Sequence, residues 1–192
     1  MGKIIVSENT SLDGVIQDPR GEEGLGRGDW FARVGDKDLE EWTEALTAEA
    51  QAAEALLLGR RSYEYFAARY PSRSGAMADR LNGMPKYVVS ATLEDVDAWS
   101  NSTVLKGDVA SEVSMLKQRV NGDIVVYASG RLVPKLIEHD LVDELRLMMY
   151  PFVVGAGRRV FGETDCMKPM RLINARTVGD SIVLLTYQPT KD

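Results

Sequence analysis

Three stretches of the chain carry residue types that can bind a phosphate. They are Gly59–Ser62, Ser90–Thr92 and Ala128–Val133, and each directly follows apolar, β-favouring residues. In the third, the apolar run Ile124–Tyr127 leads through small residues into a helical pattern. The first N–H groups of a helix lack internal partners and lie at the positive end of its dipole, so small residues there let a phosphate reach the main chain. An ordinary tight turn is the alternative.

The first stretch adds two guanidinium groups. Arg60 and Arg61 follow the apolar run Leu56–Leu58, and Ser62 is a candidate cap for the helix that begins there. Because a guanidinium can hold a phosphate through two parallel hydrogen bonds, the pair indicates an anion site. Two solvent-exposed arginines without a ligand are the alternative.

Strands and helices that alternate along the chain must position these stretches. A helix is expected over Asp38–Ala55, with Leu39, Trp42, Leu46 and Ala50 on one face. Strands are expected at Lys3–Glu8, Leu56–Leu58, Lys86–Ser90, Ser102–Leu105, Ile124–Tyr127 and Asp143–Pro151, followed by a hairpin of Met170–Thr177 and Ser181–Gln188. The pattern predicts an α/β fold with three layers and a mixed sheet. Ligands of such sheets bind at the carboxyl ends of the strands, so the three stretches are expected to line one crevice.

Composition excludes several classes of function. The 192 residues carry a net charge of −6, which argues against nucleic acid or an anionic membrane as the main partner. No apolar run approaches the length that spans a bilayer, and the first residues lack a signal peptide, so a cytoplasmic location is expected. Cys166 and His139 are the only cysteine and histidine, which leaves no zinc site built from these residue types, and no metal is expected.

Six segments, in their order and spacing, resemble the dihydrofolate reductase-like superfamily. The resemblance is closer to stand-alone relatives of the C-terminal reductase domain of the bifunctional riboflavin-biosynthesis deaminase-reductase, and it covers nearly the whole chain. The segments are Ser11–Gly14, Gly59–Glu64, Val88–Ser90, Ser129–Leu132, Leu141–Leu145 and Pro151–Phe161. The resemblance implies one domain over residues 1–192, with a three-layer α/β/α architecture, about eight strands and a C-terminal antiparallel hairpin.

The resemblance also implies an NADPH-dependent reductase. In the family, the first two stretches hold the adenosine ribose and its 2′-phosphate, the third holds the pyrophosphate, and the nicotinamide lies against Val15 and Ile16. The cofactor-binding residues that it implies are Gly59, Arg60, Arg61, Ser62, Ser90, Ala91, Thr92, Ala128, Ser129, Gly130, Arg131, Leu132, Val133 and Ile16.

Two departures from dihydrofolate reductases bear on the substrate. Those enzymes have a glycine pair where this chain has Ala128 and Ser129, and their substrate carboxylate has no clear counterpart on the Asp38–Ala55 helix. No catalytic residue is assigned. The substrate-binding candidates are Asp13, Trp30, Glu40 and Glu44, with exposed carboxylates or a loop-anchoring tryptophan as the alternatives.

Three functions are compatible with these residues. The first is reduction, by NADPH, of a ribosylamino-pyrimidine phosphate or a related heterocyclic or carbonyl compound, as in a 5-amino-6-(5-phosphoribosylamino)uracil reductase. The second is reduction of dihydrofolate or another pteridine, which needs a buried carboxylate on the long helix. The third is a non-catalytic nucleotide-binding module. A homodimer is expected because such reductase domains commonly pair, with Leu145–Tyr150 as a candidate contact.

Overall fold

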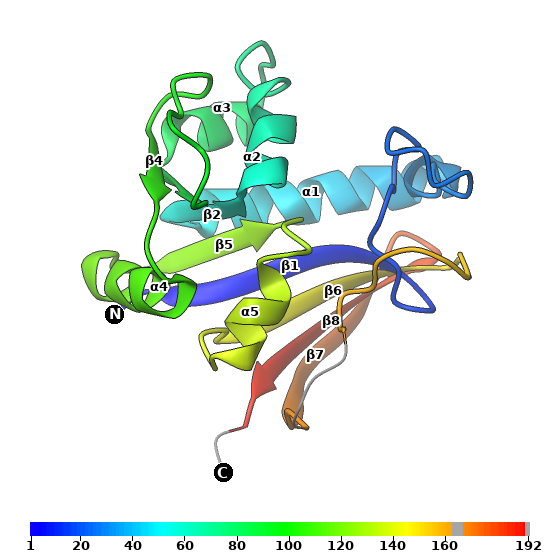
Figure 1. Ribbon diagram of the computed structural model, residues 1–192. Helices are drawn as coiled ribbons and strands as arrows, with labels where there is room; N and C mark the ends of the chain where they lie inside the picture. The colour runs from blue at the N-terminus through cyan, green and yellow to red at the C-terminus, as the bar shows by residue number, and fades with distance from the viewer. Residues whose placement is uncertain (163–166, 191–192) are drawn as a thin grey trace.

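The computed structural model describes residues 1–162 and 167–190, and Cys166 lies outside them. Within these ranges, eight strands form one sheet in the order β4-β3-β2-β5-β1-β6-β8-β7 (Figure 1). The strands are β1 Lys3–Ser11, β2 Ala55–Gly59, β3 Lys86–Val89, β4 Ser102–Leu105, β5 Asp123–Tyr127, β6 Glu144–Tyr150, β7 Met170–Val178 and β8 Ile182–Pro189. Strands β1 to β6 pair in parallel, whereas β8 is antiparallel to β6 and β7. The mixed sheet and its C-terminal hairpin confirm the predicted fold.

Helices cover both faces of the sheet and form two separate cores (Figure 1). On one face lie α1 Asp36–Ala52, α2 Arg60–Ala67 and α3 Ala76–Gly83, and on the other lie α4 Val109–Arg119 and α5 Val133–Glu138. Leu46 and Ala50 of α1 belong to the first core, and Leu116 and Leu136 of α4 and α5 to the second. No helix of the described residues is long and apolar enough to cross a bilayer.

The longest helix begins and ends earlier than its sequence pattern predicts. Helix α1 begins at Asp36, where the Asp38 side chain accepts a hydrogen bond from the backbone N–H of Gly35 at 3.1 Å. It ends at Ala52, because the chain must turn before β2 begins at Ala55. The same Asp38 carboxylate accepts hydrogen bonds from the backbone N–H groups of Asp180 and Ser181 and from the Ser181 hydroxyl. One buried carboxylate therefore joins the start of α1 to the β7–β8 turn.

Strand β1 is longer than predicted and lies between partners of different length. Its pairing with β5 stops at Ser7 opposite Tyr127, whereas its pairing with β6 continues to Ser11 opposite Tyr150. The segment Glu8–Ser11 therefore has no strand beside it on the β5 side. This opening lies at the carboxyl ends of parallel strands, where open α/β sheets bind ligands.

One expectation about β6 is wrong. Leu145–Tyr150 was a candidate dimer contact, but β6 lies between β1 and β8 in the sheet. Both of its hydrogen-bonding edges are occupied, and Leu145 and Tyr150 are buried in the two cores. The outermost strand on this side is β7.

Candidate functional site

Hydrogen bonds join the three predicted phosphate-binding stretches to one another. The backbone N–H of Gly59, at the end of β2, donates to the Ser129 hydroxyl at 3.0 Å. The backbone N–H of Ser129, after β5, donates to the Ser62 hydroxyl at 2.8 Å. The Arg60 guanidinium donates from Nη1 to the Thr92 hydroxyl at 2.7 Å, which brings in the end of β3. The three stretches thus form one surface at the carboxyl ends of the strands.

Ser62 does not cap its own helix, contrary to the prediction. It lies inside the first turn of α2, whose N-cap residue is Gly59, and its hydroxyl is bonded to the turn after β5. No side chain caps α2, so the N–H groups of its first turn keep the capacity to bind an anion. Beside them, Arg60 pairs with Glu64 at 2.7 Å, while Arg61 is exposed and has no carboxylate partner within the described residues.

The turn after β5 has a backbone conformation that glycine adopts easily. Ala128 and Ser129 have φ angles of 50° and 64°, in the left-handed region. Such a conformation costs an L-residue about 1–2 kcal/mol, so the surrounding structure must hold it in place. The Ser129 carbonyl accepts hydrogen bonds from Leu132 and Val133, which brings the N–H groups of this turn together. The positions where dihydrofolate reductases have a glycine pair therefore keep the glycine-like conformation with other residues.

Gly130 allows a second segment to reach this turn. A Cβ atom built at Gly130 would lie 2.6 Å from Cδ1 of Ile16, so a side chain at this position would displace the tip of the Ile16 side chain. The backbone N–H of Ile16 also donates to the carbonyl of Arg158 at 2.9 Å. Ile16 therefore covers the same end of the sheet as the β5 turn. Arg131 is exposed beside it.

The Ser90–Thr92 stretch forms a compact turn at the end of β3. The buried Ser90 hydroxyl accepts hydrogen bonds from the backbone N–H groups of Thr92 at 3.2 Å and Leu93 at 3.0 Å. Ala91 and Thr92 are exposed. The Ser90 side chain thus shapes the turn, and the Thr92 hydroxyl faces the Arg60 guanidinium.

Asp13 acts as an anionic clamp between two loops. Its carboxylate accepts hydrogen bonds from the Ser11 hydroxyl at 2.7 Å and from the N–H groups of Val154 and Gly155 at 3.0 and 2.8 Å. The bond from Ser11, followed by the bond from Val154, lowers the pKa of Asp13 to about 2. A carboxyl group that is ionised and engaged in this way is unsuited to donate a proton at neutral pH.

The other substrate candidates lie in different surroundings. Trp30 and Phe31 are buried, and each packs against Tyr150 with ring centroids 5.2 and 5.5 Å apart. They anchor the preceding glycine-rich loop to the first core. Glu40 and Glu44 are exposed side chains of α1. Within the described residues, no hydrogen bond or ring contact joins any of these side chains to the surface formed by the three strand ends.

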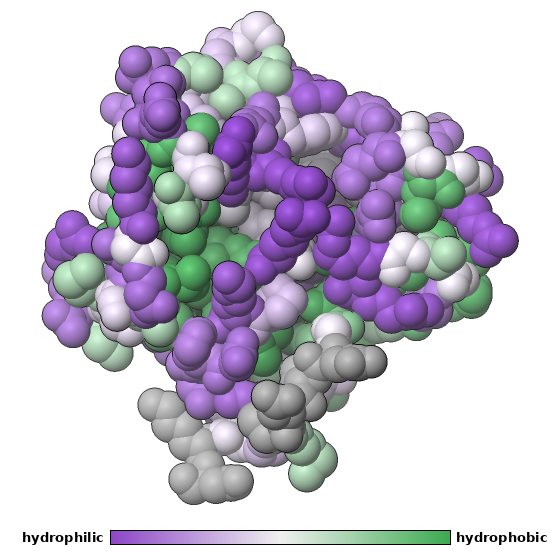
Figure 2. All heavy atoms as spheres, in the orientation of Figure 1, coloured by the Kyte–Doolittle hydropathy of each residue, from purple (hydrophilic) through white to green (hydrophobic). Residues whose placement is uncertain are grey.

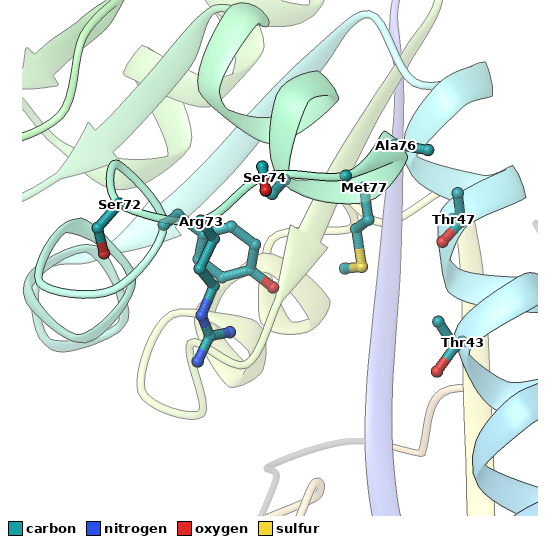
Figure 3. Close-up of a pocket in the computed structure, with 10 residues that line it drawn as sticks. Thr43, Thr47, Ser72, Arg73, Ser74, Ala76 and Met77 are labelled. Carbon is teal, nitrogen blue, oxygen red and sulfur yellow. The ribbon is translucent and has the colours of Figure 1, made fainter.

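A cavity of about 600 Å³ lies between α1 and the loop that joins α2 to α3 (Figure 3). Thr43 and Thr47 of α1 face the side chains of Arg73 and Met77 across it. The remaining lining residues are Tyr70, Ser72, Ser74, Gly75, Ala76 and Ala78. The Arg73 guanidinium lies 5.3 Å from the centre of the Tyr70 ring and has no carboxylate partner within the described residues. The cavity therefore combines hydroxyl groups with one unpaired positive charge.

Buried polar groups that sequence reasoning missed lie on the α1 face of the sheet. Tyr127, Ser7 and Arg146 occupy one row across β5, β1 and β6, and Glu49 of α1 pairs with Arg146 at 2.7 Å. Burial, together with the Glu49 carboxylate, raises the pKa of Tyr127 far above its ordinary value. A signal was present, because Glu49 follows Leu46 and precedes Ala50 on the apolar face of the predicted helix.

Glu8 is a second polar residue that sequence reasoning missed. It is 5% exposed, and its Oε1 atom has no hydrogen-bond partner within the described residues. Burial raises its pKa well above the ordinary value of 4.5. It lies on β1 directly after Ser7, where the pairing with β5 ends. Its signal was a lone acid within the run Ile4–Thr10.

The face that carries these strand ends is hollowed and mixed in character. In Figure 2, which has the orientation of Figure 1, green apolar side chains are visible between purple hydrophilic ones over β5 and α5. Apolar walls with a few convergent polar groups are typical of sites for small molecules.

Comparisons with known proteins agree with this geometry. The family model for the RibD C-terminal domain matches residues 2–184. The protein YyaP of Bacillus subtilis (strain 168), itself uncharacterized, is 26% identical over 190 residues, which are 96% of this chain and 94% of that protein.

Solved structures show the same fold. A protein of Shewanella sp. PV-4 named after riboflavin biosynthesis has a TM-score of 0.73 at 21% identity, with 98% of this chain and 99% of that chain covered. The dihydrofolate reductase of Enterococcus faecalis, solved with NADP(H), has a TM-score of 0.64 at 16% identity, with 98% and 97% covered. The deaminase-reductase of Thermotoga maritima has a TM-score of 0.63 at 16% identity, and the match covers 98% of this chain but 57% of that chain.

The Asp13 clamp gives a prediction for stability. A folded-state pKa of about 2, below the ordinary 3.8, contributes stability above pH 4 that is lost as the pH falls towards 2. Asp13→Asn should lower the free energy of unfolding at pH 7 by about 1–2 kcal/mol and flatten its decline between pH 4 and 2. Urea unfolding at pH 7 and pH 3 measures both effects. Asp97→Asn, at an exposed loop position, is the control, and equal curves for Asp13→Asn and wild type would contradict the clamp.

Proposed function

Because the chain belongs to the RibD C-terminal domain family, we propose that it is an NADPH-dependent reductase of the riboflavin-biosynthesis type. It would act, like a 5-amino-6-(5-phosphoribosylamino)uracil reductase, on a small heterocyclic or carbonyl compound. The observation that carries the proposal is the hydrogen-bonded junction of Gly59–Ser62, Ser90–Thr92 and the turn after β5. This junction offers backbone N–H groups and guanidinium groups along one crevice, as an extended phosphorylated cofactor requires.

Each part of the junction has a distinct task in this proposal. Arg61, with Arg60 and Thr92 beside it, would bind the adenosine 2′-phosphate. At the turn from Ala128 to Val133, the N–H groups of Gly130 and Arg131 would bind the pyrophosphate, because those of Ser129, Leu132 and Val133 already donate within the protein. Ile16 would cover the nicotinamide, because it already packs against Gly130 at this end of the sheet. When bound, NADPH supplies the hydride, and the chain contributes position and electrostatic environment.

The substrate would bind in the cavity between α1 and the α2–α3 loop. Tyr70, which lines it, packs against the core that contains Tyr127 at the end of β5, so the cavity lies on the α1 side of the sheet. Arg73 would bind an anionic group of the substrate. The two buried carboxylates of α1 do not favour a pteridine, because Asp38 holds the β7–β8 turn and Glu49 pairs with Arg146.

Cofactor titration tests the proposal directly. We expect micromolar binding of NADPH and much weaker binding of NADH, measured by quenching of tryptophan fluorescence. Arg61→Gln should weaken NADPH binding by about tenfold or more and leave NADH unchanged, because only NADPH carries the 2′-phosphate. Arg119→Gln, an exposed arginine at the end of α4, is the matched control. Absence of binding by both nucleotides would refute the reductase assignment.

Arg73 gives a separate prediction for the substrate. Pyrimidine and pteridine intermediates can be screened as substrates by the loss of NADPH absorbance at 340 nm. We expect the screen to identify a substrate that carries a phosphate or carboxylate. Arg73→Gln should then raise KM by about tenfold, with a smaller effect on kcat, because the side chain contacts a group remote from the reacting carbon. An unchanged KM would place the substrate elsewhere, without affecting the cofactor titration.

We also propose a homodimer, with β7 as its contact in place of β6. Residues 171–177 of this outermost strand are exposed, including Leu172 at 51% and Ile173 at 45%. An exposed edge with apolar side chains is a template for pairing with another strand. Light scattering should give about twice the chain mass of 21.2 kDa, and Leu172→Lys with Ile173→Lys should give the single-chain mass. Met115→Lys on exposed α4 is the control, and a monomeric wild type would refute the dimer.

A further inference from the structure

Glu8 lies on the side of β1 that faces α4 and α5. Side chains alternate between the two faces of a strand, so Glu8 shares its face with Ile4 and Val6. Both of these belong to the core formed with α4 and α5, as does Leu147, the partner of Glu8 on β6. Glu8 therefore points away from α1 and from the cavity beside it.

Around Glu8, this face is built from the segments that close the crevice. The same core contains Leu132 and Val133 from the end of the β5 turn, and Ile16 packs against it. Ile16 reaches Gly130, and β5 no longer accompanies β1 beyond Ser7. Glu8 is thus the first residue of β1 beyond its pairing with β5, on the side of the sheet against which Ile16 packs.

The carboxyl group has an unsatisfied hydrogen-bonding capacity there. Its Oε1 atom is buried and has no partner within the described residues, and Val6 and Leu147 beside it on the same face are apolar. A buried polar atom without a partner costs about 1–3 kcal/mol, and folded proteins keep few of them. Burial is the cause that raises the pKa of Glu8. A ligand that brings a complementary amide would remove this cost.

We propose that Glu8 is a positioning residue that pairs with the carboxamide of the nicotinamide ring. Its hydroxyl would donate to the carboxamide oxygen, and its carbonyl would accept from the carboxamide NH₂. This inference rests on the proposed function. The pairing would fix the rotation of the nicotinamide ring about its glycosidic bond, which decides which face of the ring is turned towards the substrate.

Two ligands separate this role from a structural one. NADPH carries the carboxamide, whereas 2′-phosphoadenosine 5′-diphosphoribose has the same phosphates and riboses and lacks the nicotinamide. Glu8→Met, a near-isostere without hydrogen-bonding groups, should weaken NADPH binding by about tenfold and leave binding of the second ligand unchanged. Glu8→Gln, whose amide can also pair with a carboxamide, should bind NADPH within about threefold of wild type. Isothermal titration calorimetry measures all six affinities.

The outcomes distinguish a positioning role of Glu8 from a purely structural one. If Glu8→Met binds NADPH as tightly as wild type, Glu8 is a structural acid and the inference fails while the proposed function stands. If wild type binds neither ligand, the proposed function fails and the inference falls with it. Unchanged binding of the second ligand shows that each variant has folded. Glu8→Leu replaces Glu8→Met if methionine does not pack, and the same comparison then applies.

Discussion

The hydrogen bonds of Ser129 fix the geometry on which the rest of the site depends. Its hydroxyl accepts from Gly59 and donates to the Tyr127 carbonyl, while its N–H donates to Ser62. The bonds with Gly59 and Ser62 tie the end of β5 to the start of α2, and all three hold a serine in a left-handed conformation that it disfavours. Without them, the N–H groups of the turn and of α2 would have no fixed relation to each other.

The unequal partners of β1 create the second requirement, a gap that reaches into the sheet. Because β5 stops opposite Ser7 while β6 continues to Tyr150, the segment Glu8–Ser11 has no strand beside it on the β5 side. At this level the α1 face of the sheet carries Ser7 and Tyr127, and the other face carries Glu8. A ring inserted in the gap would contact a different chemical environment on each side.

Local sequence patterns predicted the elements and the contacts near them, and failed where the outcome depended on distant residues. Four apolar residues before Ala128 predicted β5, and the repeats in α1 predicted its buried face. The role of Ser62 was wrong, because its partner is 67 positions away along the chain. The expected dimer contact at Leu145–Tyr150 was wrong, because a hydrophobic strand does not reveal its neighbours. For the same reason the sequence left open whether Trp30 binds substrate or anchors its loop to the core, because its neighbour Tyr150 is distant along the chain.

Charged residues at positions expected to be buried were better indicators of functional groups than charged residues at positions expected to be exposed. Glu40 and Glu44 were the predicted substrate-binding carboxylates of this helix, yet both are exposed. Glu49, on the apolar face of the same helix, forms an ion pair with Arg146. Glu8 likewise lies in a strand that is buried along most of its length, and one of its oxygens has no partner within the described residues. Burial of such groups lowers the stability of the fold, so a function that uses them offers a physical reason for their presence. The buried polar groups of β1 and α1 are therefore the first places to look for what distinguishes this chain from reductases with the same fold.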